Sequence, residues 1–256
     1  MRYIKPISIL AIVLIPVLLV GYINLFLLNN TEKNQKSIDS GAPKELAGKL
    51  GRIYSTVLEK NPEIKFNVNV ELEGKNPAFT QVLDRENKIS TTFISSFFWE
   101  SGEKQEIQKI NKEFTKKVII HELAHVLSLN NIQIGTKSTV NKENVNKDLF
   151  DKEEKNCLPN YYNLEGCFSE NSYLSSFYKT FWNGESLSKS SDGFVSDVAK
   201  INVEEDLAES FSLWILGYGD YKPGKIQLEK INFFEKFSEL KEIKSTIKKT
   251  FITEDL

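Results

Sequence analysis

The amino-acid sequence predicts an α+β fold, in which a small mixed sheet packs on one long helix and a mainly helical part follows. Three observations predict this fold. Segments with strand character cluster between residues 66 and 99, helical periodicity takes over from residue 103, and an apolar run opens the chain. The 256 residues therefore divide into a transmembrane segment at residues 1–28, a polar linker at 29–45 and one folded domain at 46–256.

The composition excludes several classes of protein. Hydrophobic residues make up 40% of the chain and charged residues 27%, which is ordinary for a globular protein and too apolar for a disordered one. The formal net charge of −2 provides no basic excess of the kind that binds nucleic acid. We therefore expect no nucleic-acid partner, and the sequence does not indicate an oligomeric state.

At the N-terminus, Arg2 and Lys5 precede an apolar run over residues 7–28. A helix of about 20 apolar residues is long enough to cross the hydrocarbon core of a membrane. The run therefore predicts an uncleaved membrane anchor. The positive charges before it favour a cytoplasmic N-terminus, which places the folded domain outside the cytoplasm. A cleaved signal peptide, which would leave a secreted protein, is the alternative.

The first half of the folded domain is predicted to contain one helix and a sheet. The helix covers residues 46–59 and is ended by Asn61 and Pro62. Three strands are expected next, over residues 66–72, 79–83 and 89–99. We expect the third strand at an edge of the sheet, where an extended substrate could pair with it. An ordinary core strand is the alternative.

The second half is predicted to be mainly helical. A long helix over residues 103–129 has apolar residues at helical spacing. Residues 131–160 are rich in Asn, Lys and Glu with weak periodicity, and we expect a surface excursion there. Further helices are predicted from residue 172 onward, over residues 203–216, and as one or two amphipathic helices over residues 225–251.

Both histidines of the chain fall in the segment His121-Glu122-Leu123-Ala124-His125. On a helix, residues four apart lie on the same face, so the two imidazoles can bind one cation. Zinc suits them because it takes nitrogen ligands in a tetrahedral arrangement. Glu122 is then expected beside the metal, where it can hold a water and take its proton. The alternative, two histidines without a metal, is disfavoured because the surrounding helix is apolar.

A catalytic zinc normally has three protein ligands, and the chain has no third histidine. The acidic segment that begins at Asn202 supplies the missing carboxylate. We predict Glu205 as the ligand and Glu209, four residues later on the same face, as the acceptor for a ring N–H of a ligand histidine. Glu204 and Asp206 are alternative ligands. Glu205 also stands three residues after Asn202, so a capping box that only closes the helix start is a further alternative.

The two cysteines, Cys157 and Cys167, lie close together in a loop-like stretch. Outside the cytoplasm, such a pair predicts a disulfide that closes a short loop. A zinc site is the poorer interpretation, because no histidine is nearby.

The histidine-containing segment 121–125 and the acidic segment 205–209 together resemble those of the gluzincins. These zinc metallopeptidases combine the H-E-x-x-H helix with a glutamate ligand on a later helix. The spacing of Glu205 and Glu209 is also similar to that in the catalytic domain of anthrax lethal factor and in related bacterial secreted or anchored peptidases. The resemblance covers two short segments. It implies a zincin-like metallopeptidase domain with Zn²⁺ as cofactor, Glu205 as a zinc ligand and Glu209 as the support of a ligand histidine.

The implied activity is that of a zinc metalloendopeptidase that hydrolyses a peptide or protein substrate outside the cytoplasm, with Glu122 as general base on a zinc-bound water. One position departs from the family. Lethal factor has a tyrosine seven residues before the ligand glutamate, where this chain has Val198. Either Tyr173, Tyr178 or Tyr218 stabilises the oxyanion instead, or activity is reduced. Two other interpretations stay open: a zinc-binding but inactive membrane-tethered scaffold, and a membrane-tethered structural protein without metal.

Overall fold

The computed structural model describes residues 41–71, 78–95, 112–182 and 193–253. Within these ranges, no helix combines the length and the apolar character that crossing a membrane requires. The predicted transmembrane segment at residues 1–28 lies outside them and stays a prediction.

A three-stranded mixed sheet forms the N-terminal part of the described fold. Its strands are in the order β1-β3-β2, with β1 parallel and β2 antiparallel to β3. The preceding helix α2 packs against β1 and begins at residue 41, so the last five residues predicted as linker are helical. These elements are α2 (Gly41–Val57), β1 (Phe66–Glu71), β2 (Ala78–Asp84) and β3 (Ile89–Ser95).

The prediction that the third strand lies at an edge of the sheet is wrong. β3 pairs with β1 on one side and with β2 on the other, so both of its edges are already hydrogen-bonded. Residues 89–95 therefore offer no free edge to an extended substrate, and residues 96–99 of the predicted strand lie outside the described part of the chain. The β-branched and aromatic residues of Ile89–Ser95 reflect a central position between two strands, and among the described strands β1 and β2 are the outer ones.

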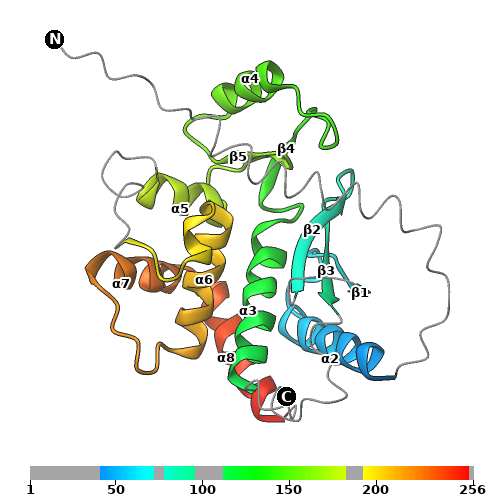
Figure 1. Ribbon diagram of the computed structural model, residues 1–256, viewed down its shortest axis with the longest axis vertical. Helices are drawn as coiled ribbons and strands as arrows, with labels where there is room; N and C mark the ends of the chain where they lie inside the picture. Colours follow the sequence, from blue (N-terminus) through cyan, green and yellow to red (C-terminus); the bar gives the residue numbers. More distant parts are fainter. Residues whose placement is uncertain (1–40, 72–77, 96–111, 183–192, 254–256) are drawn as a thin grey trace.

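Helix α3 (Lys112–Ser128) lies between the sheet on one side and the C-terminal helices on the other (Figure 1). This position explains why residues 118–127 are mainly apolar, since a helix segment packed on most sides presents few residues to water. Ile120, Leu123 and Val126 point in different directions around the axis and are all fully buried. The predicted helix began at residue 103, and its residues 103–111 lie outside the described part of the chain.

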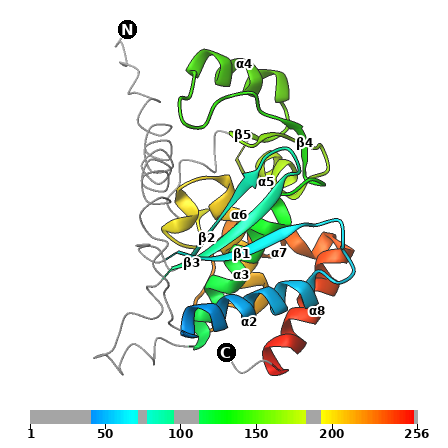
Figure 2. The ribbon, with the colours of Figure 1, turned by 90° about the vertical axis from the view of Figure 1, so that its right-hand side faces the viewer.

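The predicted surface excursion at residues 131–160 is wrong in part, because it contains regular structure. A second, antiparallel sheet in the order β4-β6-β5 lies beyond the end of α3, and helix α4 stands beside it (Figures 1 and 2). Only Cys157 of α4 is buried, which is why the helix leaves no apolar period in the sequence. These elements are β4 (Ile134–Lys137), α4 (Lys147–Cys157), β5 (Tyr162–Asn163) and β6 (Gly166–Phe168).

The C-terminal part is helical, as predicted, and packs against α3 mainly through α6. The bounds of α6 agree with the prediction, because Asn202 caps its start and Gly217, with a φ of 81°, ends it. Its elements are α5 (Tyr173–Phe181), η3 (Val198–Lys200), α6 (Val203–Leu216), α7 (Lys225–Asn232), η4 (Phe233–Lys236) and α8 (Ser238–Thr253). The described fold is therefore mixed α+β, as the sequence predicts.

Candidate metal centre

The two histidines of α3 and the first turn of α6 meet in one cluster. The Nε2 atoms of His121 and His125 lie 3.1 Å apart. The carboxylate of Glu205 reaches both rings, with 3.0 Å from Oε2 to Nε2 of His121 and 3.6 Å from Oε1 to Nε2 of His125. The side chain of Glu205 is 25% exposed, so the cluster is open to solvent on that side.

These distances fit a tetrahedral metal. Zinc–ligand bonds of about 2.0–2.1 Å at tetrahedral angles place neighbouring ligand atoms about 3.3 Å apart. The separation of the two Nε2 atoms lies close to this value, and each of the two Glu205 oxygens lies close to it from one of the two rings. His121, His125 and Glu205 also form the one group of three metal-binding side chains found among the described residues. The set of two imidazoles and one carboxylate is one that catalytic zinc uses, with one position left for water.

The electrostatics of the cluster favour a cation. Burial lowers the pKa of His121, but the carboxylates of Glu205 and Glu209 outweigh burial and raise this pKa to about 10. The pKa of His125 is raised for the same reason, mainly by Glu205. Burial raises the pKa of Glu205, and the two imidazoles more than offset it, holding the carboxyl well below its usual range. Positive charge is therefore stabilised between these three side chains.

Glu209 fixes the orientation of the first imidazole. The Nδ1 of His121 lies 2.9 Å from Oε1 of Glu209, while Oε2 of the same carboxylate accepts a hydrogen bond of 2.9 Å from Lys117. Burial raises the pKa of Glu209, but His121, Lys117 and a hydrogen bond with Ser196 lower it to about 2, so the group is an acceptor at neutral pH. An ionised acceptor places the proton of the neutral ring on Nδ1 and leaves the lone pair of Nε2 facing Glu205 and His125.

The other acidic side chains of the first turn of α6 have different partners. Glu204 accepts hydrogen bonds from Tyr161 and Asn163. Asp206 accepts from Lys230 at 2.6 Å and from the indole N–H of Trp182 at 2.9 Å. Of the three predicted candidates for the third ligand, only Glu205 therefore faces the histidines.

The alternative in which Glu205 only closes the start of the helix is wrong, although Asn202 does cap it. The cap is made by the side chain of Asn202, whose Oδ1 accepts a 2.8 Å hydrogen bond from the backbone N–H of Glu205. The Glu205 side chain is left to turn toward the two imidazoles. One residue pair thus starts the helix and orients a carboxylate at the same time.

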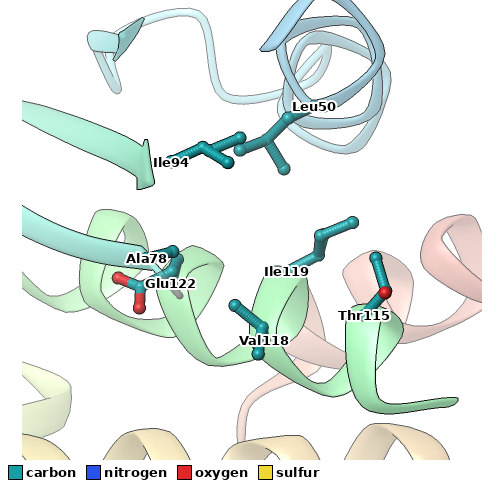
Figure 3. A pocket seen from close by; sticks show the side chains of 7 residues that line it. All are labelled: Leu50, Ala78, Ile94, Thr115, Val118, Ile119 and Glu122. Atoms are coloured by element: carbon teal, nitrogen blue, oxygen red, sulfur yellow. The ribbon is translucent and has the colours of Figure 1, made fainter. Parts of the chain in front are cut away.

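Glu122 lies on the side of α3 that faces the sheet. Its side chain is buried, and Oε2 has no hydrogen-bond partner among the described residues. Burial raises its pKa, while the neighbouring His121 and His125 counteract the rise. Figure 3 shows the carboxylate at one end of a small apolar pocket between α2, α3 and the ends of β2 and β3. The other lining residues are Leu50, Ala78, Ile94, Thr115, Val118 and Ile119.

The position expected to hold a tyrosine offers no donor. Val198 lies in η3 and is 41% exposed. The hydroxyl of Tyr173 donates to Glu239 at 3.0 Å, the ring of Tyr178 packs against that of Tyr161, and Tyr218 follows the end of α6. Among the described residues, none of these three hydroxyls hydrogen-bonds to the cluster.

Three contacts to the acidic residues beside the cluster were not predicted from sequence. Lys117 stands four residues before His121, so helical spacing alone could have placed it beside Glu209. Tyr161 and Asn163 contact Glu204 from a distant hairpin, and no sequence pattern indicates that contact. The predicted disulfide between Cys157 and Cys167 is present and belongs to the same hairpin.

Comparison of the chain with protein-family models, with curated proteins and with solved structures found no match. The similarity to gluzincins is therefore carried by residues 121–125 and 205–209 alone. The function has to be inferred from the geometry and the chemistry of the cluster.

Proposed function

We propose that the chain is a zinc-dependent metalloendopeptidase with a zincin-like catalytic domain. The observation that carries the proposal is the convergence of three side chains from two helices. His121 and His125 of α3 and Glu205 of α6 each offer one ligand atom, and these atoms lie within 4.8 Å of one another, close enough for one metal ion to bind all three. Glu205 is distant in sequence from the two histidines, so its carboxylate is evidence for a metal site that is independent of the H-E-x-x-H motif.

In the proposed site, the chain's own residues have separate tasks. His121, His125 and Glu205 would hold the metal, and Glu209 would keep His121 in the binding orientation. A bound zinc would supply polarisation of the scissile carbonyl and acidification of the attacking water. Glu122 would accept the proton of that water and return it to the leaving amine, for which its raised pKa and its free Oε2 are suited.

The disulfide supports a location outside the cytoplasm. Bonds such as Cys157–Cys167 persist in oxidising compartments and are rare in the cytosol. The apolar run at residues 7–28 would anchor the domain to the membrane from the outer side, or release it if the run is cleaved.

A zinc-binding scaffold without turnover is the second candidate. It is favoured by Val198, which has no hydrogen-bond donor where lethal factor has a tyrosine, and by the absence of any tyrosine hydroxyl bonded to the cluster among the described residues. Such a module would need the metal ligands and would not need Glu122.

Glu122→Gln separates the two candidates in the full chain. Metal analysis should find about one zinc per chain in both wild type and variant, because the variant keeps all three proposed ligands. Cleavage of an unstructured protein such as casein should fall by about 10²–10⁴-fold, because the amide cannot act as a base. Glu63→Gln makes the same chemical change on the exposed surface and should leave both readouts unchanged.

Each outcome has a distinct meaning. A wild-type chain without zinc after purification in non-chelating buffer contradicts the metal site itself. Zinc without cleavage in the wild type contradicts the peptidase and favours the scaffold. Cleavage that survives Glu122→Gln contradicts the role of Glu122.

A further inference from the structure

The hairpin closed by the disulfide reaches the first turn of α6. Cys157 ends α4 and Cys167 lies in β6, so their bond closes the loop that contains β5. The backbone of Tyr161 is held inside this loop, where its carbonyl accepts a 2.9 Å hydrogen bond from the N–H of Phe168. Figure 1 shows β5 beyond the N-terminal end of α6.

Two side chains of the hairpin point toward α6. Tyr161 and Asn163 are two residues apart and therefore project to the same side of the strand. Both donate to the same oxygen, Oε1 of Glu204, with a Tyr161 distance of 3.1 Å. The amide of Asn163 is held in this orientation, because its Oδ1 accepts from the backbone N–H groups of Glu165 at 2.8 Å and Gly166 at 3.3 Å.

The intervening residue points the other way. The hydroxyl of Tyr162 is hydrogen-bonded to Glu153 at 2.7 Å and to Ser138 at 2.8 Å, both outside α6. The hairpin thus has one side that braces α4 and another that braces α6. This division makes Tyr162 a matched reference for Tyr161.

Glu204 itself is not needed to start the helix. The cap of α6 is supplied by Asn202, and the first turn contains two other acidic residues, Glu205 and Asp206. A partly buried carboxylate costs free energy unless it is hydrogen-bonded, and within the described part of the chain the donors to Glu204 are Tyr161 and Asn163 of the hairpin. Its position, directly before Glu205, couples the hairpin to the residue that faces both histidines.

We propose that the disulfide-closed hairpin positions the first turn of α6 for metal binding, with Tyr161 and Asn163 as positioning residues that act through Glu204. This inference rests on the metal site of the proposed function and adds a support that lies outside it. Removing either donor does not substitute any of the three proposed ligands, but it loosens the turn that carries Glu205. Opening the disulfide loosens the same turn from farther away.

Zinc affinity of the full chain, measured by competition with a chromophoric chelator, tests the proposal. Tyr161→Phe removes one donor without changing volume. Asn163→Asp keeps the acceptor that holds the turn and sets a carboxylate oxygen against Glu204. Both should raise the Kd for zinc about 10–100-fold, the usual effect of losing a group that orients a ligand. Tyr162→Phe should change the Kd by less than about twofold, because its partners lie on the other side of the hairpin.

Two further measurements separate positioning from general stability. The visible absorption of the Co²⁺-substituted chain should change in Tyr161→Phe and stay that of the wild type in Tyr162→Phe, since only the first alters the placement of a ligand. The double variant Cys157→Ser, Cys167→Ser should weaken zinc binding in the same direction as Tyr161→Phe. Thermal unfolding of each metal-free variant shows whether it is folded.

Equal zinc affinities for Tyr161→Phe and Tyr162→Phe would overturn the positioning role and leave the proposed function standing. So would a folded double serine variant with wild-type affinity. A wild-type chain without zinc affinity would overturn the proposed function, and the role of the hairpin with it.

Discussion

Replacement of Glu209 by leucine probes the metal centre without touching a proposed ligand. The carboxylate is 6% exposed and accepts from Nδ1 of His121 and from Lys117, each at 2.9 Å. Leucine has a similar volume and no acceptor, so the ring N–H of His121 is left unpaired in a site where the imidazole is only 13% exposed. An unsatisfied buried donor costs about 1–3 kcal/mol.

This cost falls mainly on the metal-bound state. In the metal-free variant the proton of the neutral ring can move to Nε2, which lies 3.0 Å from Glu205, whereas metal binding needs the lone pair on Nε2 and leaves the proton on Nδ1. At about 1.4 kcal/mol per factor of ten, the zinc Kd should rise by about 10–100-fold. Chelator competition measures this Kd directly, and thermal unfolding of the metal-free variant reports whether the fold is retained.

Lys117→Met is the matched control for this prediction. It removes the other partner of the same carboxylate, but the Lys117 side chain is 38% exposed and its ion pair is worth about 0–1 kcal/mol. The zinc Kd should therefore rise by less than about fivefold. If Glu209→Leu and Lys117→Met weaken zinc binding equally, the carboxylate does not act by orienting His121 and the reasoning is refuted.

Two further predictions concern charge. Asp206→Asn leaves the ammonium of Lys230, which is 1% exposed, without its anionic partner. Urea unfolding should therefore show a loss of about 3–5 kcal/mol in the free energy of unfolding. A loss below about 1 kcal/mol contradicts the pairing. Zinc binding should release about one to two protons per chain at pH 7, because the pKa of His121 is raised to about 10 and that of His125 is also raised in the metal-free protein, and a ligand imidazole must be neutral. Apparent affinity should then rise with pH by about ten- to a hundredfold per unit between pH 6 and 8, measurable by calorimetry in buffers of different ionisation enthalpy. A pH-independent affinity contradicts the raised pKa values.

Local signals in the sequence predicted the elements that carry the cluster. The start of α6 is encoded by Asn202 and its end by Gly217, so its bounds agree with the prediction to the residue. The i, i+4 spacing of His121 and His125 and the spacing of Glu205 and Glu209 depend only on helix geometry, which explains why the four side chains could be named in advance.

Contacts between elements could not be predicted in the same way. The order of strands in the sheet depends on tertiary packing, and the β-branched sequence of β3 fits a central strand as well as an edge strand. Helix α4 is capped by Asn146 and tied down by the disulfide, and it buries little apolar surface. Its sequence therefore lacks apolar residues at helical spacing. The choice of Glu205 over Glu204 and Asp206 follows from partners on the hairpin and on α7, which a single segment of sequence does not contain.

The place of α3 between the sheet and the C-terminal helices has a consequence for how the protein is assembled. The proposed ligands belong to α3 and α6, and these two helices come from segments on either side of the hairpin region. A zinc ion bound there would tie the early and late parts of the chain together, and its binding free energy would count toward folding. Chelation of the folded protein should then lower its free energy of unfolding and loosen the pairing of these two helices, so that the metal would act as a fastening between distant segments of the chain.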